Sequence, residues 1–384
     1  MKSIQQYLYC FIKRRSEKSH RAYYRDYYKP YLEAARTCGC RKPEATIRRE
    51  CRQLAEYWRV DPVHYYRYGF YRSDCPLTLA QMKEYIPDFF AYYLFYPRSF
   101  KDRNVLCEDK QLMYAVNAGL GVRQPRTLFF LRDGRILSER LDPLAPQEYA
   151  RTIAACRAEK IFVKPTFGVG GKGIAVFNRT DDGSGRLVDG VSGRTFDAAC
   201  LETFAAEGDY TVQEGVRQHA AMNAVYAHAI NTLRVITECV DGRARVVLAL
   251  LRMGCNGMQL DNASSGGIYA KVDVASGTLV GRAIADTRET FDAHPTTGFR
   301  FDGTPLPEWP AIETFAVSVA EKYAPIRYVG WDIALSEEGP LLIEGNNGPS
   351  IEIVQDLYGG VKSLFGIDSP DAYWYASNYS LKNL

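Results

Sequence analysis

The 384-residue chain lacks the features of membrane-spanning and secreted proteins. It has no apolar run of about 18 residues, so we expect no transmembrane helix, and only peripheral contact with a membrane stays open. The apolar stretch in MKSIQQYLYCFIKRR is too short and too polar for a signal peptide. The length and the 46% of hydrophobic residues predict a cytoplasmic globular protein of two or three domains.

Cysteine pairs with metal-binding or redox spacing are also missing. The ten cysteines are scattered, and none belongs to a C-x-x-C motif. A zinc site at Cys38, Cys40 and Cys51 would lack a clear fourth ligand. Reduced thiols in a cytoplasmic protein are the simpler interpretation.

Acidic residues are scarce at the start of the chain. Residues 1–60 contain fifteen Lys/Arg and six Asp/Glu, although the net charge of the whole chain is only +3. Sixteen of the 27 tyrosines lie within the first 96 residues. Such a segment could meet nucleic acid, an anionic membrane surface or an acidic glycan. We favour a helical domain that buries the tyrosine rings and keeps their hydroxyls wet, and we expect no nucleic-acid binding.

Glycine and lysine are concentrated in FVKPTFGVGGKG, residues 162–173. Glycine lets backbone N–H groups approach a ligand, and successive N–H groups form a concavity for anions, to which two lysines add charge. The P-loop motif is absent, because Gly173 follows Lys172 where a hydroxyl is needed. Residues 161–163 and 174–177 read as flanking strands, which also argues against a dinucleotide fingerprint. A hairpin that closes over phosphates therefore competes with a flexible surface turn.

The hydrophobic pattern changes near residue 150. The first hundred residues show mostly helical spacing interrupted by prolines, whereas strands and helices alternate later, separated by turns such as DDGSG and ASGT. This order predicts an α+β fold with antiparallel hairpins. The predicted strands are 161–164, 174–178, 210–214, 232–238, 245–251, 328–335 and 340–344, and the predicted helices are 145–159, 197–206 and 310–323.

Polar residues interrupt two apolar strands in GWDIALSEEGPLLIEGNNGPS, residues 330–350. Pairing through the SEEG turn would bring Glu344 alongside Asp332, with Asn346 on the same face as Glu344. Three oxygen ligands of this kind suit Mg²⁺. The alternative, a pair of solvated carboxylates on an edge strand, fits poorly with the apolar neighbours 341–343.

Two arginines also lie in apolar strands, Arg234 in NTLRV and Arg252 in ALLRMG. A buried guanidinium needs an anion, and phosphate or carboxylate fits its fork. Asn262, shortly before a Gly-Gly pair, marks a second donor-rich turn. A structural ion pair with Glu238 or Asp261 is the alternative.

In their order along the chain, these pieces resemble the ATP-grasp superfamily, and most closely the sugar-transfer-associated ATP-grasp family. The resemblance covers about residues 105–360 and is specific, because several spaced motifs agree at once. It implies an ATP-grasp fold, in which two α+β lobes sandwich ATP, preceded by a mainly helical segment. The matching motifs are EDKQLMY, the glycine-rich hairpin, VQEG, NTLRV, RMGCNGMQLDNASSGG, HPTTG, PLPEWP, GWDIAL and LIEGN.

The resemblance also implies a role for each motif. Lysines and the glycine loop would hold the ATP phosphates, and a hinge would read adenine through backbone groups. These nucleotide-binding residues would be Lys110, Lys164, Gly168, Gly170, Gly171, Lys172, Gly173, Gln213, Glu214 and Val216. The ligands of two Mg²⁺ ions, or of Mn²⁺ in their place, would be Asp332, Glu344 and Asn346. The residues near the transferred phosphoryl group and the acceptor would be Arg252, Asn262, Arg234 and His294, although His294 could equally be a loop histidine.

Two departures from the family pattern leave the stabilisation of an acyl phosphate open. The residues after Asn346 are Asn347-Gly348-Pro349-Ser350 and not a run of small residues with Pro-Gly. Gly330 stands two positions before Asp332, where some relatives have an arginine. We assign the stabilising role to Arg252.

The resemblance implies an ADP-forming carboxylate–amine ligase that acts in polysaccharide or cell-envelope modification. A small or glycan-linked carboxylate would attack the γ-phosphate, and an amine would displace phosphate from the acyl phosphate. A kinase acting on a sugar hydroxyl is one alternative and would need a base such as Asp261 or His294. A non-catalytic nucleotide-binding module is another, but it would be expected to have lost a lysine or a metal ligand, and none is lost here.

The motifs also predict the domain organisation. The expected parts are a basic, tyrosine-rich and mainly helical region (1–104), a region preceding the lobes (105–150), a small lobe with the glycine hairpin (151–225), a large lobe with the metal site (226–365) and a C-terminal tail (366–384).

Overall fold

A computed structural model describes residues 4–100, 103–168, 170–262 and 266–375. The chain divides into two compact units. The first combines Met1–Lys101 with Ser350–Leu384, and the second is Asp102–Pro349. The sequence prediction extends the large lobe to residue 365, whereas in the structure the residues after 349 join the N-terminal helices.

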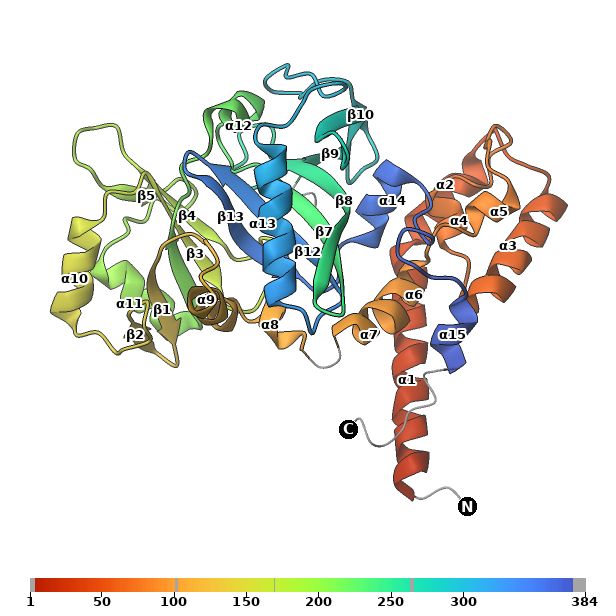
Figure 1. The fold of residues 1–384 in the computed structure, drawn as a ribbon, viewed down its shortest axis with the longest axis horizontal. Coiled ribbons are helices and arrows are strands. Elements are labelled where there is room, and N and C mark those ends of the chain that lie inside the picture. Colours follow the sequence, from red (N-terminus) through yellow and green to blue (C-terminus); the bar gives the residue numbers. More distant parts are fainter. Residues whose placement is uncertain (1–3, 101–102, 169, 263–265, 376–384) are drawn as a thin grey trace. The chain divides into compact units, whose positions relative to one another are not determined.

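Helices form the first unit, as expected for the N-terminal segment (Figure 1). Aromatic rings fill much of its interior, where Tyr28, Tyr65, Phe70 and Tyr96 are almost fully buried. Prolines start two of the helices by occupying their N-cap positions. The elements are α1 (Ile4–Tyr27), α2 (Lys29–Thr37), α3 (Glu44–Trp58), α4 (His64–Arg67), α5 (Leu79–Met82), α6 (Asp88–Phe90), the π-helix η1 (Ala91–Phe95), α7 (Tyr96–Phe100), α14 (Ile351–Tyr358) and α15 (Pro370–Tyr375).

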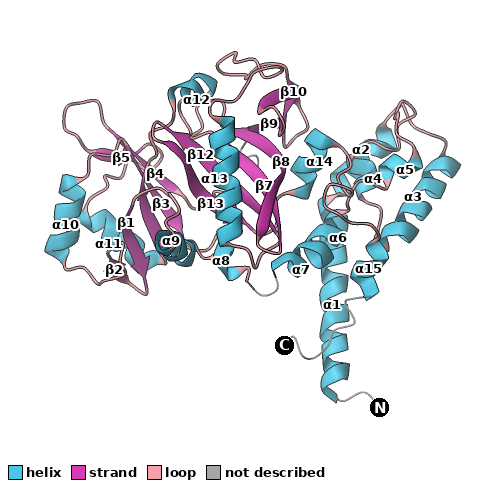
Figure 2. Ribbon diagram, viewed as in Figure 1, coloured by secondary structure: helices cyan, strands magenta, loops and turns pink. Residues whose placement is uncertain are grey.

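Two antiparallel sheets form the second unit (Figure 2). The six-stranded sheet has the order β2-β1-β6-β3-β4-β5, and the seven-stranded sheet has the order β11-β10-β9-β8-β7-β12-β13. The strands of the first are β1 (Thr127–Arg132), β2 (Arg135–Leu137), β3 (Lys160–Pro165), β4 (Ala175–Arg179), β5 (Leu187–Asp189) and β6 (Tyr210–Glu214). The strands of the second are β7 (Thr232–Val240), β8 (Arg243–Met253), β9 (Ile268–Asp273), β10 (Thr278–Ala285), β11 (Thr290–Phe291), β12 (Tyr328–Ser336) and β13 (Gly339–Asn346).

Six helices of the described residues accompany these sheets. Helix α13 packs across β7, β8, β12 and β13 (Figure 1), and α11 packs on β1 and β2. The helices are α8 (Val105–Glu108), α9 (Lys110–Gly119), α10 (Pro146–Ala155), α11 (Ala198–Glu207), α12 (Ala220–Val225) and α13 (Trp309–Lys322).

The centre of the seven-stranded sheet is buried on both faces. All nine residues of β12 are buried, as are the first eight of β7. A charged side chain on either strand must therefore find a partner inside the protein. This requirement positions the charged residues described below.

The six-stranded sheet buries only two of the six residues of β3, and these two alternate with partly buried ones. Ile161 and Val163 have no exposed surface and pack in the core with Phe177 and Val212. Because side chains alternate along a strand, Lys164 points away from this core. The alternation of side chains along β3 thus places Ile161 and Val163 on the core side of the sheet and Lys164 on the other side.

The α+β fold class is confirmed, and each predicted strand and helix of the second half is present within a few residues. Strands β9 and β10 are not among the predicted strands, although the turn between them is. No helix in the described ranges is long and apolar enough to cross a membrane.

Candidate active site

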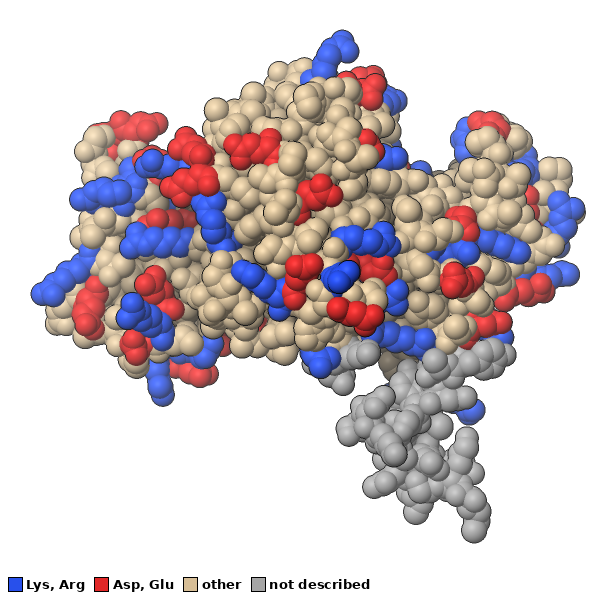
Figure 3. All heavy atoms as spheres, in the orientation of Figure 1, with Lys and Arg blue, Asp and Glu red and all other residues tan. Residues whose placement is uncertain are grey.

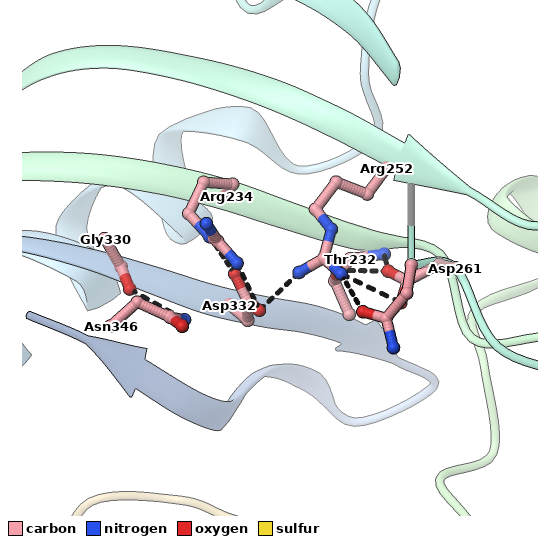
Figure 4. A network of polar contacts seen from close by, with 8 residues as sticks. Thr232, Arg234, Arg252, Asp261, Gly330, Asp332 and Asn346 are labelled. Atoms are coloured by element: carbon pink, nitrogen blue, oxygen red, sulfur yellow. Dashed lines mark hydrogen bonds and ion pairs between the residues drawn. The ribbon is translucent and has the colours of Figure 1, made fainter. Parts of the chain in front are cut away.

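Asp332 and Glu344 are paired across β12 and β13. The side chain of Asp332 is almost fully buried, and that of Glu344 is partly buried. Asn346 lies opposite Gly330, two positions from Glu344, and its amide nitrogen donates to the carbonyl of Gly330 at 3.4 Å (Figure 4). The three side chains expected to lie together therefore do so at one end of this hairpin.

Two arginines converge on Asp332 (Figure 4). Arg234, the cross-strand neighbour of Asp332 on β7, donates from Nη2 to Oδ2 at 2.9 Å and from Nε to Oδ1. Arg252 on β8 donates from Nη1 to the same Oδ2 at 2.5 Å. Asp332 is therefore the anion that both buried guanidinium groups require.

These contacts set the protonation of the two carboxyl groups. Burial acts to raise the pKa of Asp332, but the charges of Arg234 and Arg252 outweigh it and lower the pKa to about 2. Burial and the neighbouring charge of Asp332 raise the pKa of Glu344. Lys110 and the two arginines oppose that rise only in part. A cation bound next to Glu344 would stabilise the ionised form of its carboxyl group.

Arg252 is held from its other side by the loop that follows β8. Its Nη2 donates to Oδ1 of Asn262 and lies 3.5 Å from Oδ1 of Asp261. Asp261 in turn accepts hydrogen bonds from the N–H of Thr232, at 3.1 Å, and from its hydroxyl. This network fixes the guanidinium of Arg252 between β12 and the loop.

Two lysines from the other part of the unit complete the cluster of charges. Lys164 donates to Oε1 of Gln213 on β6 at 3.0 Å. Burial lowers the pKa of Lys164 to about 8, although the carboxylates Glu344 and Asp261 oppose the shift. Lys110 begins α9 and donates to the carbonyl of Gly168 at 3.0 Å.

The glycine-rich loop connects β3 and β4, as the hairpin interpretation predicts. Gly170, Gly171 and Gly173 have φ angles of 67°, 72° and 75°, which residues with a side chain adopt at a cost. At Gly171 a Cβ atom would lie 2.2 Å from Nδ2 of Asn262. The loop therefore packs directly on the asparagine that holds Arg252.

The segment after β6 includes an N–H group that is available to a ligand. The N–H groups of Glu214 and Gly215 donate to the carbonyls of Arg126, at 2.9 Å, and Lys160, at 2.8 Å. Within the described residues, the N–H of Val216 donates to no protein acceptor. Gln213, one residue before this pair, links Lys164 to the hydroxyl of Thr127.

The sequence matches the family described as sugar-transfer associated ATP-grasp over residues 93–364, which is more than half of the chain. The chain belongs to this ATP-grasp family. No curated protein sequence matches it significantly.

Solved structures similar to this ATP-grasp protein include several ligases. Biotin carboxylase from Campylobacter jejuni is 14% identical with a TM-score of 0.39, and the match covers 72% of this chain and 47% of that one. The VanG D-Ala:D-Ser ligase from Enterococcus faecalis is 13% identical with a TM-score of 0.41, covering 70% and 62%. D-alanine–D-alanine ligase from Bacillus anthracis is 11% identical with a TM-score of 0.36, covering 71% and 70%. This chain thus spans about half the length of the first of these enzymes, and its family assignment rests on the sequence match.

Among the described residues, no hydrogen bond joins His294 to another candidate site residue of this ATP-grasp protein. It is buried, with Nε2 bonded to the carbonyl of Gly254 at 2.8 Å. Its Nδ1 accepts from the N–H groups of Thr296 and Thr297 at 3.2 and 3.3 Å. Because both ring nitrogens are engaged, the structure favours the loop-histidine interpretation over an acceptor-site role.

Of the two carboxylates considered as alternative partners for the arginines, one approaches an arginine and the other does not. Glu238 does not pair with Arg234, because it accepts hydrogen bonds from Arg245 and Arg327, each at 3.0 Å from Nε. Asp261 does approach Arg252. Lys172 is exposed on the glycine-rich loop.

The structure gives a reason for the missing arginine at position 330. A Cβ atom on Gly330 would lie 2.8 Å from Cβ of Pro349 and 2.9 Å from Cδ of Arg234. The stem of Arg234 thus occupies the space that a side chain at residue 330 would need. A guanidinium reaches Asp332 from β7 instead.

Sequence reasoning missed two residues that hold α9 in place. Gln111 is buried and donates to Oγ1 of Thr166 at 2.8 Å and to the carbonyl of Leu131 at 3.1 Å. At Gly345 a Cβ atom would lie 2.7 Å from Cε of Met113, so α9 also packs closely on β13. Both contacts place Lys110 near Glu344. The only available signal was the position of Gln111 next to Lys110 in EDKQLMY.

The residues present fit a magnesium ion. Glu344 and Asn346 offer a carboxylate and an amide oxygen, the hard donors that Mg²⁺ prefers, and the raised pKa of Glu344 marks a position where a cation is favourable. Asp332 already carries two arginines, so it would share its oxygens between them and a metal. Nowhere in the described residues do three His, Cys, Asp or Glu side chains form a metal site, neither here, where only two carboxylates meet, nor near Cys38, Cys40 and Cys51.

Proposed function

We propose that this ATP-grasp protein is an ADP-forming ligase that activates a carboxylate as an acyl phosphate and couples it to an amine. Lys110, Lys164 and the glycine-rich loop supply the charges and backbone groups that polyphosphate recognition needs. The free N–H of Val216 is suited to an acceptor nitrogen of adenine. Glu344 and Asn346, with Asp332, would hold a Mg²⁺ ion, and such an ion would neutralise phosphate charge.

The reaction proposed here requires positioning and charge compensation. A carboxylate oxygen of the substrate attacks the γ-phosphorus, the bond from phosphorus to the bridging oxygen breaks, and ADP leaves. An amine then attacks the acyl carbon, the carbon–oxygen bond breaks, and phosphate and a proton leave. Arg252 and Arg234 present guanidinium groups that can hold the negative oxygens as both steps proceed.

We propose a ligase and not a kinase because both candidate bases, Asp261 and His294, are already engaged by other groups. Transfer to a sugar hydroxyl calls for a base that accepts its proton. Both oxygens of Asp261 are already engaged by Thr232 and Arg252, and both ring nitrogens of His294 are engaged by backbone groups. A substrate carboxylate is ionised at neutral pH and needs no base for its attack, so the site suits it better.

A screen for ADP release tests this proposal. The purified protein is incubated with ATP and Mg²⁺ against carboxylates, amines and sugars, singly and in pairs. The proposal predicts ADP release with free phosphate that needs a carboxylate and rises with an amine. ADP release with a sugar alone and a phosphorylated sugar as product would contradict it. Participation in polysaccharide or cell-envelope modification is part of the proposal, and glycan-linked uronic acids belong in the screen for that reason.

A further inference from the structure

The side chain of Gln111, in the first turn of α9, is a buried amide that uses both its nitrogen and its oxygen. It is only 1% exposed. Its Nε2 donates to Oγ1 of Thr166 at 2.8 Å and to the carbonyls of Leu131 at 3.1 Å and Tyr210 at 3.2 Å. Its Oε1 accepts from Nε of Arg132 at 2.8 Å. One amide thus ties the start of α9 to the adjacent strands β1 and β6 and to the residue that follows β3.

Lys110 and Gln111 hold the same residue, Thr166, by different groups. The backbone N–H of Lys110 donates to the carbonyl of Thr166 at 3.3 Å, whereas the amide of Gln111 binds its hydroxyl. The ammonium group of Lys110 reaches the carbonyl of Gly168, two residues farther along the glycine-rich loop. Thr166 is itself buried, and its N–H donates to the carbonyl of Asp209 at 2.9 Å. The lysine and the base of the loop are therefore fixed to each other through the residue that Gln111 binds.

Other contacts hold α9 in place without the side chain of Gln111. Asp109 caps the helix by accepting hydrogen bonds from two backbone N–H groups of its first turn. Farther along, the buried amide of Asn117 accepts from the hydroxyl of Tyr323 at 2.8 Å. Loss of the Gln111 amide should therefore disturb mainly the first turn, where Lys110 lies.

We propose that Gln111 is a positioning residue for nucleotide binding, which holds Lys110 and the base of the glycine-rich loop in the arrangement that meets the phosphates. A lysine that is already held in place loses less conformational freedom when phosphate binds. Acidic and basic side chains are interspersed on the face of the second unit in Figure 3, so no patch of one sign on that face would attract a nucleotide, and the placement of individual cations matters more.

Arg132 fixes the orientation of the Gln111 amide. A flipped amide would set Oε1 against two backbone carbonyls and turn its N–H groups toward a guanidinium, which has no acceptor. The inference rests on the nucleotide site of the proposed function and not on the choice between ligase and kinase.

A double-mutant cycle tests whether Gln111 acts through Lys110. Titration calorimetry gives the affinity of the full-length protein for the Mg²⁺ complex of a non-hydrolysable ATP analogue, in the wild type, Gln111→Ala, Lys110→Ala and the double variant. We expect Lys110→Ala to bind at least about tenfold more weakly and Gln111→Ala about fivefold more weakly. The double variant should match Lys110→Ala within about twofold, because Gln111 has nothing to position once Lys110 is gone.

Asn117→Ala is the matched control, because it removes another buried amide of α9 away from the first turn. It should keep the wild-type affinity within about twofold. Arg132→Met changes a partly exposed side chain and serves as the second variant should Gln111→Ala fail to fold. It leaves Oε1 of Gln111 without its donor and should weaken binding about two- to fivefold, but not in the Lys110→Ala background.

Three results would overturn the proposal: losses that multiply in the double variant, an equal loss in Asn117→Ala, or wild-type affinity in both Gln111→Ala and Arg132→Met. A wild type that does not bind the analogue would instead contradict the proposed function, and this inference with it.

Discussion

Asp332 on β12 and Arg234 on β7 are cross-strand neighbours joined by two hydrogen bonds between carboxylate and guanidinium. Arg252 adds a third bond to the same carboxylate. A candidate metal ligand is thus held by the two arginines that we expect to meet the substrate. A metal bound at this point would therefore have to share one buried anion with the two arginines.

The first prediction concerns this buried pair. Arg234→Met should lower the free energy of unfolding by about 3 kcal/mol, the lower end for breaking a buried ion pair, because Arg252 still compensates Asp332. Arg245→Met is the control: its partner Glu238 keeps Arg327, and Arg245 is 61% exposed, so the loss should stay below about 1 kcal/mol. Urea denaturation measures both. Equal losses in the two variants would contradict the account of Asp332.

Nucleotide binding should depend on Lys164. Lys164→Ala removes one charge-assisted contact with phosphate, and we expect a non-hydrolysable ATP analogue to bind about ten- to a hundredfold more weakly. Lys160→Ala is the matched control, because this lysine begins the same strand and its Nζ donates to the carbonyl of His228. Titration calorimetry gives both affinities. Lys164 would be excluded from the site by an affinity equal to that of the wild type.

Closure of the glycine-rich loop should depend on Gly171. Gly171→Ala would place Cβ 2.2 Å from Nδ2 of Asn262 at a φ of +72°. We expect the variant to bind the ATP analogue at least about tenfold more weakly, since the loop must shift. Gly183→Ala has nearly the same φ, +76°, but nothing lies within 4 Å of its Cβ position. Both variants should lose about 1–2 kcal/mol of stability from backbone strain, so equal nucleotide affinity in the two would remove the loop–Asn262 contact from the account.

The hairpin that carries Asp332 and Glu344 was predictable from the sequence alone. A short turn joins its two strands, and side chains alternate between the two faces along each strand. Together these features fix which residues lie opposite each other. The ion pair between Arg234 and Asp332 could not be predicted, because the two residues meet only when β7 lies beside β12. No local pattern encodes the order of strands in a sheet. The hydrogen bond of His294 was likewise not predictable, because its partner Gly254 lies forty positions away in the sequence.

Acid should destabilise the first unit through His64. This side chain is completely buried, and neither ring nitrogen has a hydrogen-bond partner among the residues that the structure describes. Burial lowers the pKa of His64 from about 6.5 to about 3. The unfolded chain therefore binds the proton more readily, so the stability contributed by the neutral ring is complete above pH 6.5 and falls as the pH drops toward 3.

Between pH 7 and pH 5 the wild type should lose about 2 kcal/mol more than His64→Phe, which cannot bind the proton. Urea denaturation at both pH values provides the comparison. If the two proteins lost stability in parallel, another group would be responsible for the acid sensitivity.

The most direct test of the ligase proposal is to trap the acyl phosphate with hydroxylamine. With the carboxylate substrate identified by ADP release, the protein is incubated with ATP, Mg²⁺ and hydroxylamine but without amine. We predict a hydroxamate formed together with ADP and phosphate, without AMP, because attack is at the γ-phosphorus. Its formation should be lost in Lys164→Ala, Arg252→Met and Glu344→Gln and kept in Glu338→Gln, where an exposed glutamate pairs with Arg123. ADP release with no hydroxamate and a stable phosphorylated product would contradict the account.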